Sequence, residues 1–345
     1  MADEIPKNMR AVVLEKYQPN VIDAIRGLQV RDRPVPTPGY GQVLIRIEAA
    51  PCNPSDLLLL QGRYGTLKTL PTVPGWEGAG QVAASGGGLF ARWLVGKRVA
   101  CALPGDRDGT WAEYFVADAT DCIPLKAALP IEQAATFIVN PLTAMALLET
   151  ARRAGHRAAV HTVGASQLGR MMLNIAADMS YPLIHMVRRN EQAEMLEARG
   201  AKYVLNASQE GFAEQLARLA KQLNATAVFE AVAGEMTGMV LNAMPPKSAV
   251  YLYGALSEQP CAGIDPVEVI FHEKTLSGFF LRNWLRERGF IGVVRTVAKV
   301  QRMLIDKKIE TSVQRHLRFD EVIEGLQQYV AHMTDGKVLI FSRSK

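Results

Sequence analysis

The chain has 345 residues, of which 48% are hydrophobic and 21% are charged, and its formal net charge is +5. This composition is typical of a globular protein and excludes a disordered or fibrous one, while the length favours two domains. The basic excess is small and scattered, with no run of five like charges, so the sequence gives no support to nucleic-acid binding.

The targeting and redox features indicate a cytoplasmic protein. Residues 1–7 are polar and lack the apolar stretch of a signal peptide. No apolar run of 18 residues predicts a membrane span. The four cysteines form no C-x-x-C pair, so we expect reduced thiols instead of a disulfide framework. The expected protein binds neither nucleic acid nor membrane.

The first part of the chain is rich in predicted strands and turns. Prolines and glycines separate short runs of alternating apolar residues, which is the pattern of strands joined by turns. The strand candidates are residues 9–15, 42–50, 80–84 and 97–101. A compact, turn-rich barrel is the natural interpretation.

From Pro130 onward, helical and strand patterns alternate. The expected strands are residues 158–163, 182–187, 203–205, 226–229, 248–253 and 275–281. The expected helices are residues 131–150, 167–178, 190–199, 212–223 and 236–243. The tail adds helices at 293–306 and 319–333 and a strand at 337–342. The alternation predicts an α/β fold with a doubly wound parallel sheet, because such strands are joined by right-handed crossovers.

Residues 160–169 (VHTVGASQLG) run from a strand through a tight turn into a helix. Gly164 allows the turn, Ser166 is small enough for a pyrophosphate to approach, and Gly169 lets the helix pack closely on the strand. The pattern G-x-S-x-x-G is one glycine short of the dinucleotide fingerprint, and such loops also occur as plain connections. Its place at the head of the strand–helix series favours a dinucleotide site.

The end of the next strand indicates which dinucleotide binds. An NAD enzyme usually presents Asp or Glu there to the ribose hydroxyls. Here the strand ends in Arg188 and Arg189, and Glu191 is already in the following helix. Guanidinium groups suit a 2′-phosphate, so the sequence predicts NADPH in preference to NADH. The alternative is a pair of surface arginines that only follow a strand.

Several motifs together resemble the medium-chain dehydrogenase/reductase superfamily. Residues 74–82 (PGWEGAGQV) are similar to its P-G-x-E-x-x-G-x-V signature. The sequence resembles two zinc-free branches, the quinone oxidoreductases and the 2-enoyl thioester reductases. The segments that favour the second branch are 53–56 (NPSD), 61–65 (QGRYG), 139–144 (VNPLTA), 253–260 (YGALSEQP), and 278–281 (GFFL) followed by Trp284. The resemblance implies a GroES-like β-barrel catalytic domain formed by residues 1–127 and 284–345, with a Rossmann NADPH-binding domain at 128–283 inserted.

The resemblance also bears on the metal. Zinc-dependent relatives hold Zn²⁺ with Cys and His, which suit this ion. At the first ligand position this chain has Asn53, with Cys52 one residue early, and Trp76 replaces the histidine of the G-H-E motif. We therefore expect no metal, and without a Lewis acid an ordinary alcohol dehydrogenase is disfavoured.

In the resembling enoyl reductases, the tyrosine of the Q-G-x-Y stretch donates to the developing enolate and supplies a proton. That position is Tyr64 here, which we predict to be catalytic; the alternative is an amphipathic residue that lines a loop. Asn53, Trp76 and Trp284 are the expected walls of the substrate pocket, although Trp284 suits a core or an interface equally well.

The resemblance places further residues near the cofactor. Asn140 and Thr143 lie in the stretch that approaches the nicotinamide in similar proteins, although Thr143 suits a helix cap as well. Tyr253 and Gly254 follow the fifth strand of the alternating part, where a bare backbone allows close approach; Gly254 also fits a plain turn.

The sequence thus predicts an NADPH-dependent reductase that transfers hydride to an activated C=C bond of an enoyl thioester or enone. The alternatives are an NADPH:quinone oxidoreductase, an NADPH-binding protein without turnover, and an interaction scaffold without cofactor. Residues 275–281 match the edge strand through which this superfamily often dimerises, so we expect a homodimer.

Overall fold

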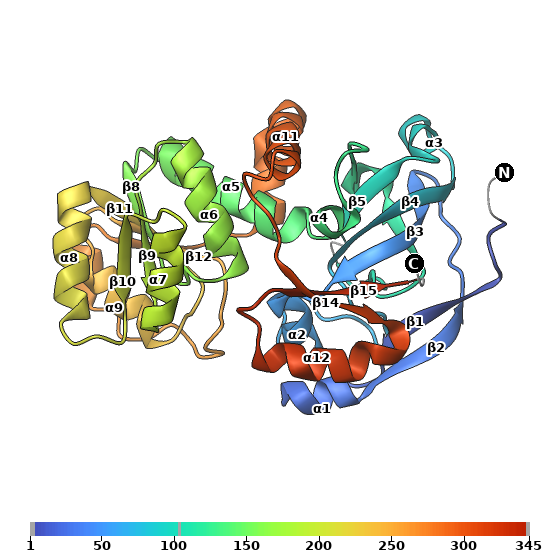
Figure 1. The fold of residues 1–345 in the computed structure, drawn as a ribbon, viewed down its shortest axis with the longest axis horizontal. Coiled ribbons are helices and arrows are strands. Elements are labelled where there is room, and N and C mark those ends of the chain that lie inside the picture. Colours follow the sequence, from blue (N-terminus) through green and yellow to red (C-terminus); the bar gives the residue numbers. More distant parts are fainter. Residues whose placement is uncertain (1–3, 103–104, 343–345) are drawn as a thin grey trace. The chain divides into compact units, whose positions relative to one another are not determined.

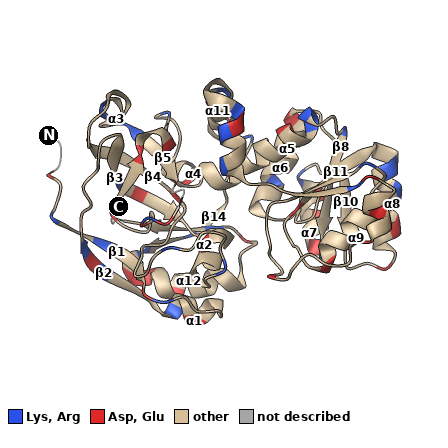
Figure 2. Ribbon diagram, turned by 180° about the vertical axis from the view of Figure 1, so that it is seen from behind, with Lys and Arg blue, Asp and Glu red and all other residues tan. Residues whose placement is uncertain are grey.

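The computed structural model describes residues 4–102 and 105–342. They form two compact units, Met1–Val139 with Gln301–Lys345, and Asn140–Val300. Each unit is built on a large sheet of its own (Figure 1). Basic and acidic residues are distributed over the helices and strands of both units (Figure 2). The sequence-based boundaries, after residues 127 and 283, stay predictions.

The first unit is built on a sheet in the order β14-β15-β3-β4-β5-β7, with β6 paired to β3. Its strands are β3 (Gln42–Pro51), β4 (Glu77–Ser85), β5 (Arg98–Ala102), β6 (Tyr114–Asp118), β7 (Cys122–Pro124), β14 (Val313–Arg318) and β15 (Lys337–Phe341). A separate pair is formed by β1 (Asn8–Leu14) and β2 (Leu28–Pro34). Because β15 pairs antiparallel with β3, segments from the two ends of the chain share one sheet (Figure 1).

Short helices complete the first unit: α1 (Val21–Arg26), α2 (Pro54–Leu60), α3 (Leu89–Leu94), α4 (Ile131–Ala135) and α12 (Val322–Ala331). Single turns of 3₁₀ helix lie at Ala119–Asp121 and Phe319–Glu321. The start of α2 bears on the candidate site. Pro54 occupies the first turn, where a missing N–H is tolerated, and the Asp56 carboxylate accepts a hydrogen bond from the Asn53 N–H at 2.7 Å.

The second unit has parallel strands in the order β10-β9-β8-β11-β12-β13. They are β8 (Ala158–His161), β9 (Leu183–Val187), β10 (Tyr203–Asn206), β11 (Ala225–Glu230), β12 (Ala249–Leu252) and β13 (Thr275–Gly278). This order confirms the predicted doubly wound sheet. Strand order reverses between β8 and β11, and ligands of such sheets bind outside the carboxyl ends of the strands at this point.

The helices of the second unit are α5 (Thr143–Arg153), α6 (Gln167–Asp178), α7 (Asn190–Ala198), α8 (Phe212–Leu223), α9 (Glu235–Ala243), α10 (Pro266–Ile270) and α11 (Leu281–Ile305), the last of which continues into the first unit. In α8, Phe212, Leu216 and Ala220 are buried at the spacing of one helix face. None of the helices in the described residues is both long and apolar enough to cross a membrane.

Two helix predictions were wrong in extent. Residues 131–150 do not form one helix: a π-helical turn at Ile138–Leu142 separates α4 from α5. Pro141 lies in this turn and cannot donate a helical hydrogen bond, which explains the interruption. The span of α11 consists of two helices that meet at a kink at Gly289, which has φ 68° and ψ 164°. The helix predicted at 293–306 therefore begins a few residues earlier, directly after this glycine.

Other elements were missed because their sequences lack a clear apolar period. The strand β2 (LQVRDRP) is mostly polar and exposed, and so is β14 (VQRHLR). The remaining missed elements are short, namely α1, α2, α3, α10, β6 and β7.

Candidate active site

A buried side-chain bridge centred on Asn53 lies in the first unit. The Lys337 ammonium donates to Asn53 Oδ1 at 2.6 Å, and Asn53 Nδ2 donates to Glu77 Oε1 at 2.9 Å. All three side chains are buried. Because an ammonium only donates and a carboxylate only accepts, these two partners fix the amide orientation. Asn53 thus connects a cation to an anion, and both ends of its amide are used inside the protein.

The second carboxylate oxygen of Glu77 holds the backbone of the turn at Ile138–Leu142. Glu77 Oε2 accepts hydrogen bonds from the N–H groups of Ile138 at 3.0 Å and Val139 at 2.9 Å. Lys337 donates a further hydrogen bond to the Cys52 carbonyl at 3.3 Å. The bridge therefore joins β15, the residues before α2, β4 and the turn at Ile138–Leu142.

Asp56, in the first turn of α2, holds the same region through hydrogen bonds to the backbone. Its carboxylate accepts from the N–H groups of Asn53 at 2.7 Å and Trp76 at 2.9 Å. Burial raises the pKa of Asp56 to about 7, although these hydrogen bonds and the Lys337 charge oppose the shift. Burial likewise raises the pKa of Glu77 and lowers that of Lys337.

These side chains do not fit the zinc ion of metal-dependent relatives. Both polar ends of Asn53 are taken by Lys337 and Glu77, and the indole of Trp76 donates from Nε1 to the Ser55 carbonyl at 3.1 Å. Burial raises the pKa of the Cys52 thiol well above its ordinary value, which disfavours the thiolate that zinc requires. Within residues 4–102 and 105–342, no three His, Cys, Asp or Glu side chains are grouped to hold a metal.

Tyr64 lies beside this bridge and stacks on Trp76. The two ring centroids are 4.5 Å apart with an interplanar angle of 36°. Tyr64 is half-buried, and its hydroxyl forms no hydrogen bond with the part of the chain that the structure describes. Burial, assisted by the nearby Asp56 charge, raises the pKa of Tyr64, so the phenol stays protonated at neutral pH. The Lys68 ammonium lies 4.9 Å from the centre of the Trp76 ring.

In the second unit, the loop after β8 leaves no room for side chains. A Cβ atom on Gly164 would lie 2.7 Å from Cβ of His185, and one on Gly169 would lie 2.2 Å from the Gly164 carbonyl oxygen. Ser166 is the N-cap of α6, and its hydroxyl accepts from the Gly169 N–H at 3.0 Å. The loop is therefore a close-packed turn into a helix N-terminus, which suits a pyrophosphate.

Arg188 and Arg189 follow β9 at the same edge of the sheet and are exposed. Neither guanidinium forms an ion pair or hydrogen bond with another described residue. The Arg188 backbone N–H donates a hydrogen bond to Oε1 of Gln192 at 3.1 Å. Both positive charges are free to meet an anion.

Tyr253 and Gly254 follow β12, also at the carboxyl edge. The Tyr253 hydroxyl lies 2.6 Å from Nε2 of the buried His161, so the phenol points into the unit. A Cβ on Gly254 would lie 3.0 Å from the Ala231 carbonyl oxygen, so a side chain here would be crowded unless Ala231 shifted by a few tenths of an ångström. The backbone of these residues, and not the Tyr253 phenol, is the part available to a ligand.

The remaining predicted residues lie on helices of the second unit or at their start. Asn140 is in the π-helical turn, and Thr143 is the first residue of α5. Neither side chain has a hydrogen-bond partner among the described residues. Trp284 is buried in α11, where the Arg288 guanidinium lies 5.6 Å from its ring centre.

Sequence reasoning missed three buried charged side chains. Lys337 and Asp56 belong to the bridge around Asn53, and Glu230 ends β11 and accepts from the N–H groups of Val232 and Ala233 at 2.6 and 2.8 Å. A signal for Lys337 was present, since this lysine opens the apolar run of residues 337–341. A lysine in a buried strand is rare unless it is paired.

Comparisons with known proteins identify the family to which the chain belongs. Residues 39–127 match the alcohol dehydrogenase GroES-like domain, and residues 168–299 match the zinc-binding dehydrogenase family. A structure from Mesorhizobium loti, provisionally assigned as an NADPH:quinone reductase, is 34% identical and covers 98% of this chain and 99% of its own, with a TM-score of 0.90. The chain belongs to the medium-chain dehydrogenase/reductase superfamily, in its zinc-free branch.

Two other members are informative. The mitochondrial enoyl-[acyl-carrier-protein] reductase of Bos taurus is 28% identical over 289 residues, which cover 82% of this chain and 75% of that protein. A mycobacterial protein solved in complex with NADPH is 25% identical, covers 96% of this chain and 99% of its own, and has a TM-score of 0.80. These matches confirm the predicted superfamily and its GroES-like domain, and they identify the chain as a medium-chain oxidoreductase.

The bridge around Asn53 predicts strong coupling between Lys337 and Glu77 in this reductase. Lys337→Met leaves a buried carboxylate without its cation, and Glu77→Gln leaves a buried ammonium without its anion, so each change is expected to cost about 3 kcal/mol of unfolding free energy. In the double variant, the loss of unfolding free energy is expected to be smaller than the sum of the two single losses, by more than about 1 kcal/mol. Urea unfolding measures all three losses. Additive losses would contradict the bridge.

The raised pKa of Asp56 predicts a pH dependence of stability. The carboxyl group has a pKa of about 7 when folded, against an ordinary value of 3.8. The unfolded chain therefore releases this proton first as pH rises, and the free energy of unfolding falls between about pH 4 and pH 7.

Asp56→Asn removes this titration, so its unfolding free energy is expected to fall less steeply than that of the wild type across the same pH window. Parallel urea titrations at several pH values measure the difference between the two slopes. Other titrating groups are common to both proteins and cancel. Identical slopes would show that Asp56 is not held in the protonated form.

Proposed function

We propose that this reductase transfers hydride from NADPH to the β-carbon of an α,β-unsaturated carbonyl compound, of the enoyl-thioester or enone type. The observation that carries this proposal is Tyr64, a half-buried phenol that stays protonated, is held against Trp76 and has an unpartnered hydroxyl. Such a group suits an acceptor whose carbonyl oxygen gains negative charge during the reaction.

NADPH supplies the hydride when bound. The loop at Gly164–Gly169 would receive its pyrophosphate, and Arg188 and Arg189 its 2′-phosphate, which they suit because both guanidinium groups lack internal partners. The unpartnered side chains of Asn140 and Thr143 would bind the nicotinamide end, and the backbone at Tyr253 and Gly254 would lie against the cofactor.

Tyr64 would donate a hydrogen bond to the acceptor's carbonyl oxygen and stabilise the enolate that forms there. The proton that the α-carbon then takes up would come from the same phenol. Trp76, which packs against Tyr64, would line the acceptor pocket. Trp284 stays a predicted pocket residue. Asn53 would support this pocket from beneath, because both ends of its amide are already bound to Lys337 and Glu77.

The Lys337–Asn53–Glu77 bridge would act by positioning. Glu77 holds the N–H groups of Ile138 and Val139, the two residues directly before Asn140. A fixed turn at this place would hold Asn140 and Thr143 ready for the nicotinamide without a loss of side-chain entropy at each turnover.

A quinone is the second candidate acceptor. It also takes hydride at a conjugated position, and the Mesorhizobium loti relative carries a provisional quinone reductase assignment. Since the Bos taurus relative is an enoyl reductase, relatives of both kinds exist. Tyr64 favours the unsaturated carbonyl, because a phenol can serve both as the enolate donor and as the proton source.

We further propose that the protein is a homodimer joined through β13. This strand forms one end of the sheet, and all four of its residues are exposed, including Leu276. An uncovered edge strand of this kind can pair with the same strand of a second copy. Light scattering distinguishes the dimer from a monomer, which would reject the proposal. A cytoplasmic location also stays a prediction.

A panel of enoyl thioesters, enones and quinones tests the acceptor, with NADPH and NADH each as the hydride source. We expect the highest kcat/KM for an unsaturated carbonyl compound and at least about a tenfold preference for NADPH, because charge-assisted contacts to a 2′-phosphate contribute about 1.5–3 kcal/mol. A quinone ahead of all enoyl compounds would select the second candidate. Tight NADPH binding with no acceptor reduced would indicate a binding protein instead.

Tyr64→Phe tests the proton donor. We expect kcat to fall by about 100-fold or more, which is the usual contribution of a general acid, while the Kd for NADPH changes by less than about twofold. Tyr17→Phe is the matched control, since the Tyr17 hydroxyl donates to the Lys68 carbonyl at 2.6 Å in the same unit. Unchanged kcat in Tyr64→Phe would reject the assignment.

A further inference from the structure

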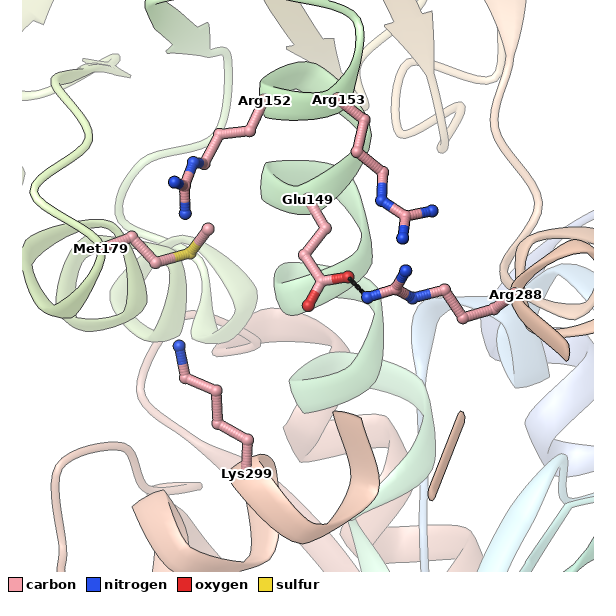
Figure 3. Close-up of a pocket in the computed structure, with 6 residues that line it drawn as sticks. All are labelled: Glu149, Arg152, Arg153, Met179, Arg288 and Lys299. Atoms are coloured by element: carbon pink, nitrogen blue, oxygen red, sulfur yellow. Dashed lines mark ion pairs between the residues drawn. The ribbon is translucent and has the colours of Figure 1, made fainter. Parts of the chain in front are cut away.

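A cationic cavity lies in the second unit, at the end of α6 opposite to the predicted pyrophosphate loop. It measures about 320 Å³ and is lined by Glu149, Arg152, Arg153, Met179, Arg288 and Lys299 (Figure 3). Ser166 caps the N-terminus of α6, and Met179 is the residue after its last turn. The rise of 1.5 Å per residue separates these two ends by roughly 18 Å. The cavity is therefore distinct from the proposed cofactor site.

The lining residues carry more positive than negative charge. Glu149 is paired with Arg288 at 2.7 Å, and Lys299 is paired with Asp178, which lies at the end of α6, at 3.2 Å. Arg152 and Arg153 form no ion pair or hydrogen bond with other residues in the described ranges. The Glu149 carboxylate is the counter-charge that lines the cavity with them, so the positive charges of Arg152, Arg153, Arg288 and Lys299 outnumber it.

Buried polar atoms without partners gather in the same region. Among the described residues, Nε of Arg288 and Oε2 of Glu149 are buried without a hydrogen-bond partner, although this Glu149 oxygen is ion-paired with Nη2 of Arg288 at 2.7 Å. Because both atoms belong to this ion pair, the charges that remain to face the cavity are mainly those of Arg152, Arg153 and Lys299.

Helix capping does not account for Arg152 and Arg153. Basic residues often occur in the last turn of a helix, where they interact with free carbonyl groups. At the end of α5 the carbonyl groups of Thr150, Ala151 and Arg152 already accept hydrogen bonds from the N–H groups of the three residues after the helix. In Figure 3 the two arginine side chains extend away from the helix end and toward the level of Glu149.

We propose that this cavity binds a small polyphosphate group carrying two or more negative charges. Guanidinium groups match phosphate oxygens with paired N–H donors. Arg152 and Arg153 supply such donors from α5, and Lys299 adds an ammonium from α11. The cavity volume limits the occupant to a small anion, and its charges surround a hollow instead of following a stripe. The ligand is inorganic polyphosphate or the phosphate end of a nucleotide.

The test uses the whole protein saturated with NADPH, so that the pyrophosphate loop is already occupied. Inorganic pyrophosphate is titrated into it by calorimetry. We expect one binding event in the wild type and roughly tenfold or weaker affinity in Arg152→Gln/Arg153→Gln, because charge-assisted hydrogen bonds are lost. Arg218→Gln/Lys221→Gln on the exposed face of α8 is the matched control and is expected to bind like the wild type.

A second titration with ADP separates the two sources. Affinity equal to or above that of pyrophosphate assigns a nucleotide, lower affinity assigns the inorganic form, and both support the proposed class. Lys299→Gln repeats the comparison if the double arginine variant does not fold. No binding by the wild type, or equal affinity in wild type and cavity variants, would overturn the proposal. Neither result depends on which acceptor is reduced.

Discussion

One amide holds two buried charges together at the centre of the candidate active site. Placing an ammonium and a carboxylate inside a protein costs several kcal/mol per ion unless hydrogen bonds compensate each of them. Asn53 does this for Lys337 and Glu77 at once, with its oxygen toward the cation and its nitrogen toward the anion. The other Glu77 oxygen then holds the turn at Ile138–Leu142. The bridge thereby connects the last strand of the chain to the turn that precedes α5.

This arrangement limits the chemistry that the site can support. Alcohol oxidation in metal-dependent relatives relies on a Lewis acid that stabilises an alkoxide, and here the side chains at those positions are an amide and an indole. A conjugated acceptor needs less: a placed hydride donor, a hydrogen bond to the oxygen that gains charge, and a proton. Tyr64 can provide the last two. The bridge of Lys337, Asn53 and Glu77 fixes the nearby backbone and takes no part in moving the hydride or the proton.

The sequence predicted the regular parts well, because their patterns are local. The helices α6 and α8 lie where the apolar period placed them, and the strand series predicted the doubly wound sheet. The π-helical turn was not predictable from a period, since it depends on Pro141 and on a carboxylate from β4. The apolar run of residues 337–341 marks Lys337 as unusual, but its partner is set only when β15 pairs with β3, and this partner, Asn53, is 284 residues away in the sequence. The sequence therefore carries a signal for the lysine and no local signal for its partner.

The central claim is that the Tyr64 phenol serves this site without a metal ion, above a bridge of Lys337, Asn53 and Glu77 that holds the turn at Ile138–Leu142 in place. The most direct measurement is steady-state reduction of the best acceptor by NADPH, before and after exhaustive dialysis against a strong chelator, with metal content determined on the same samples. The account predicts full activity after dialysis and no stoichiometric zinc at any stage. Activity that is lost on dialysis and restored by Zn²⁺ would contradict it.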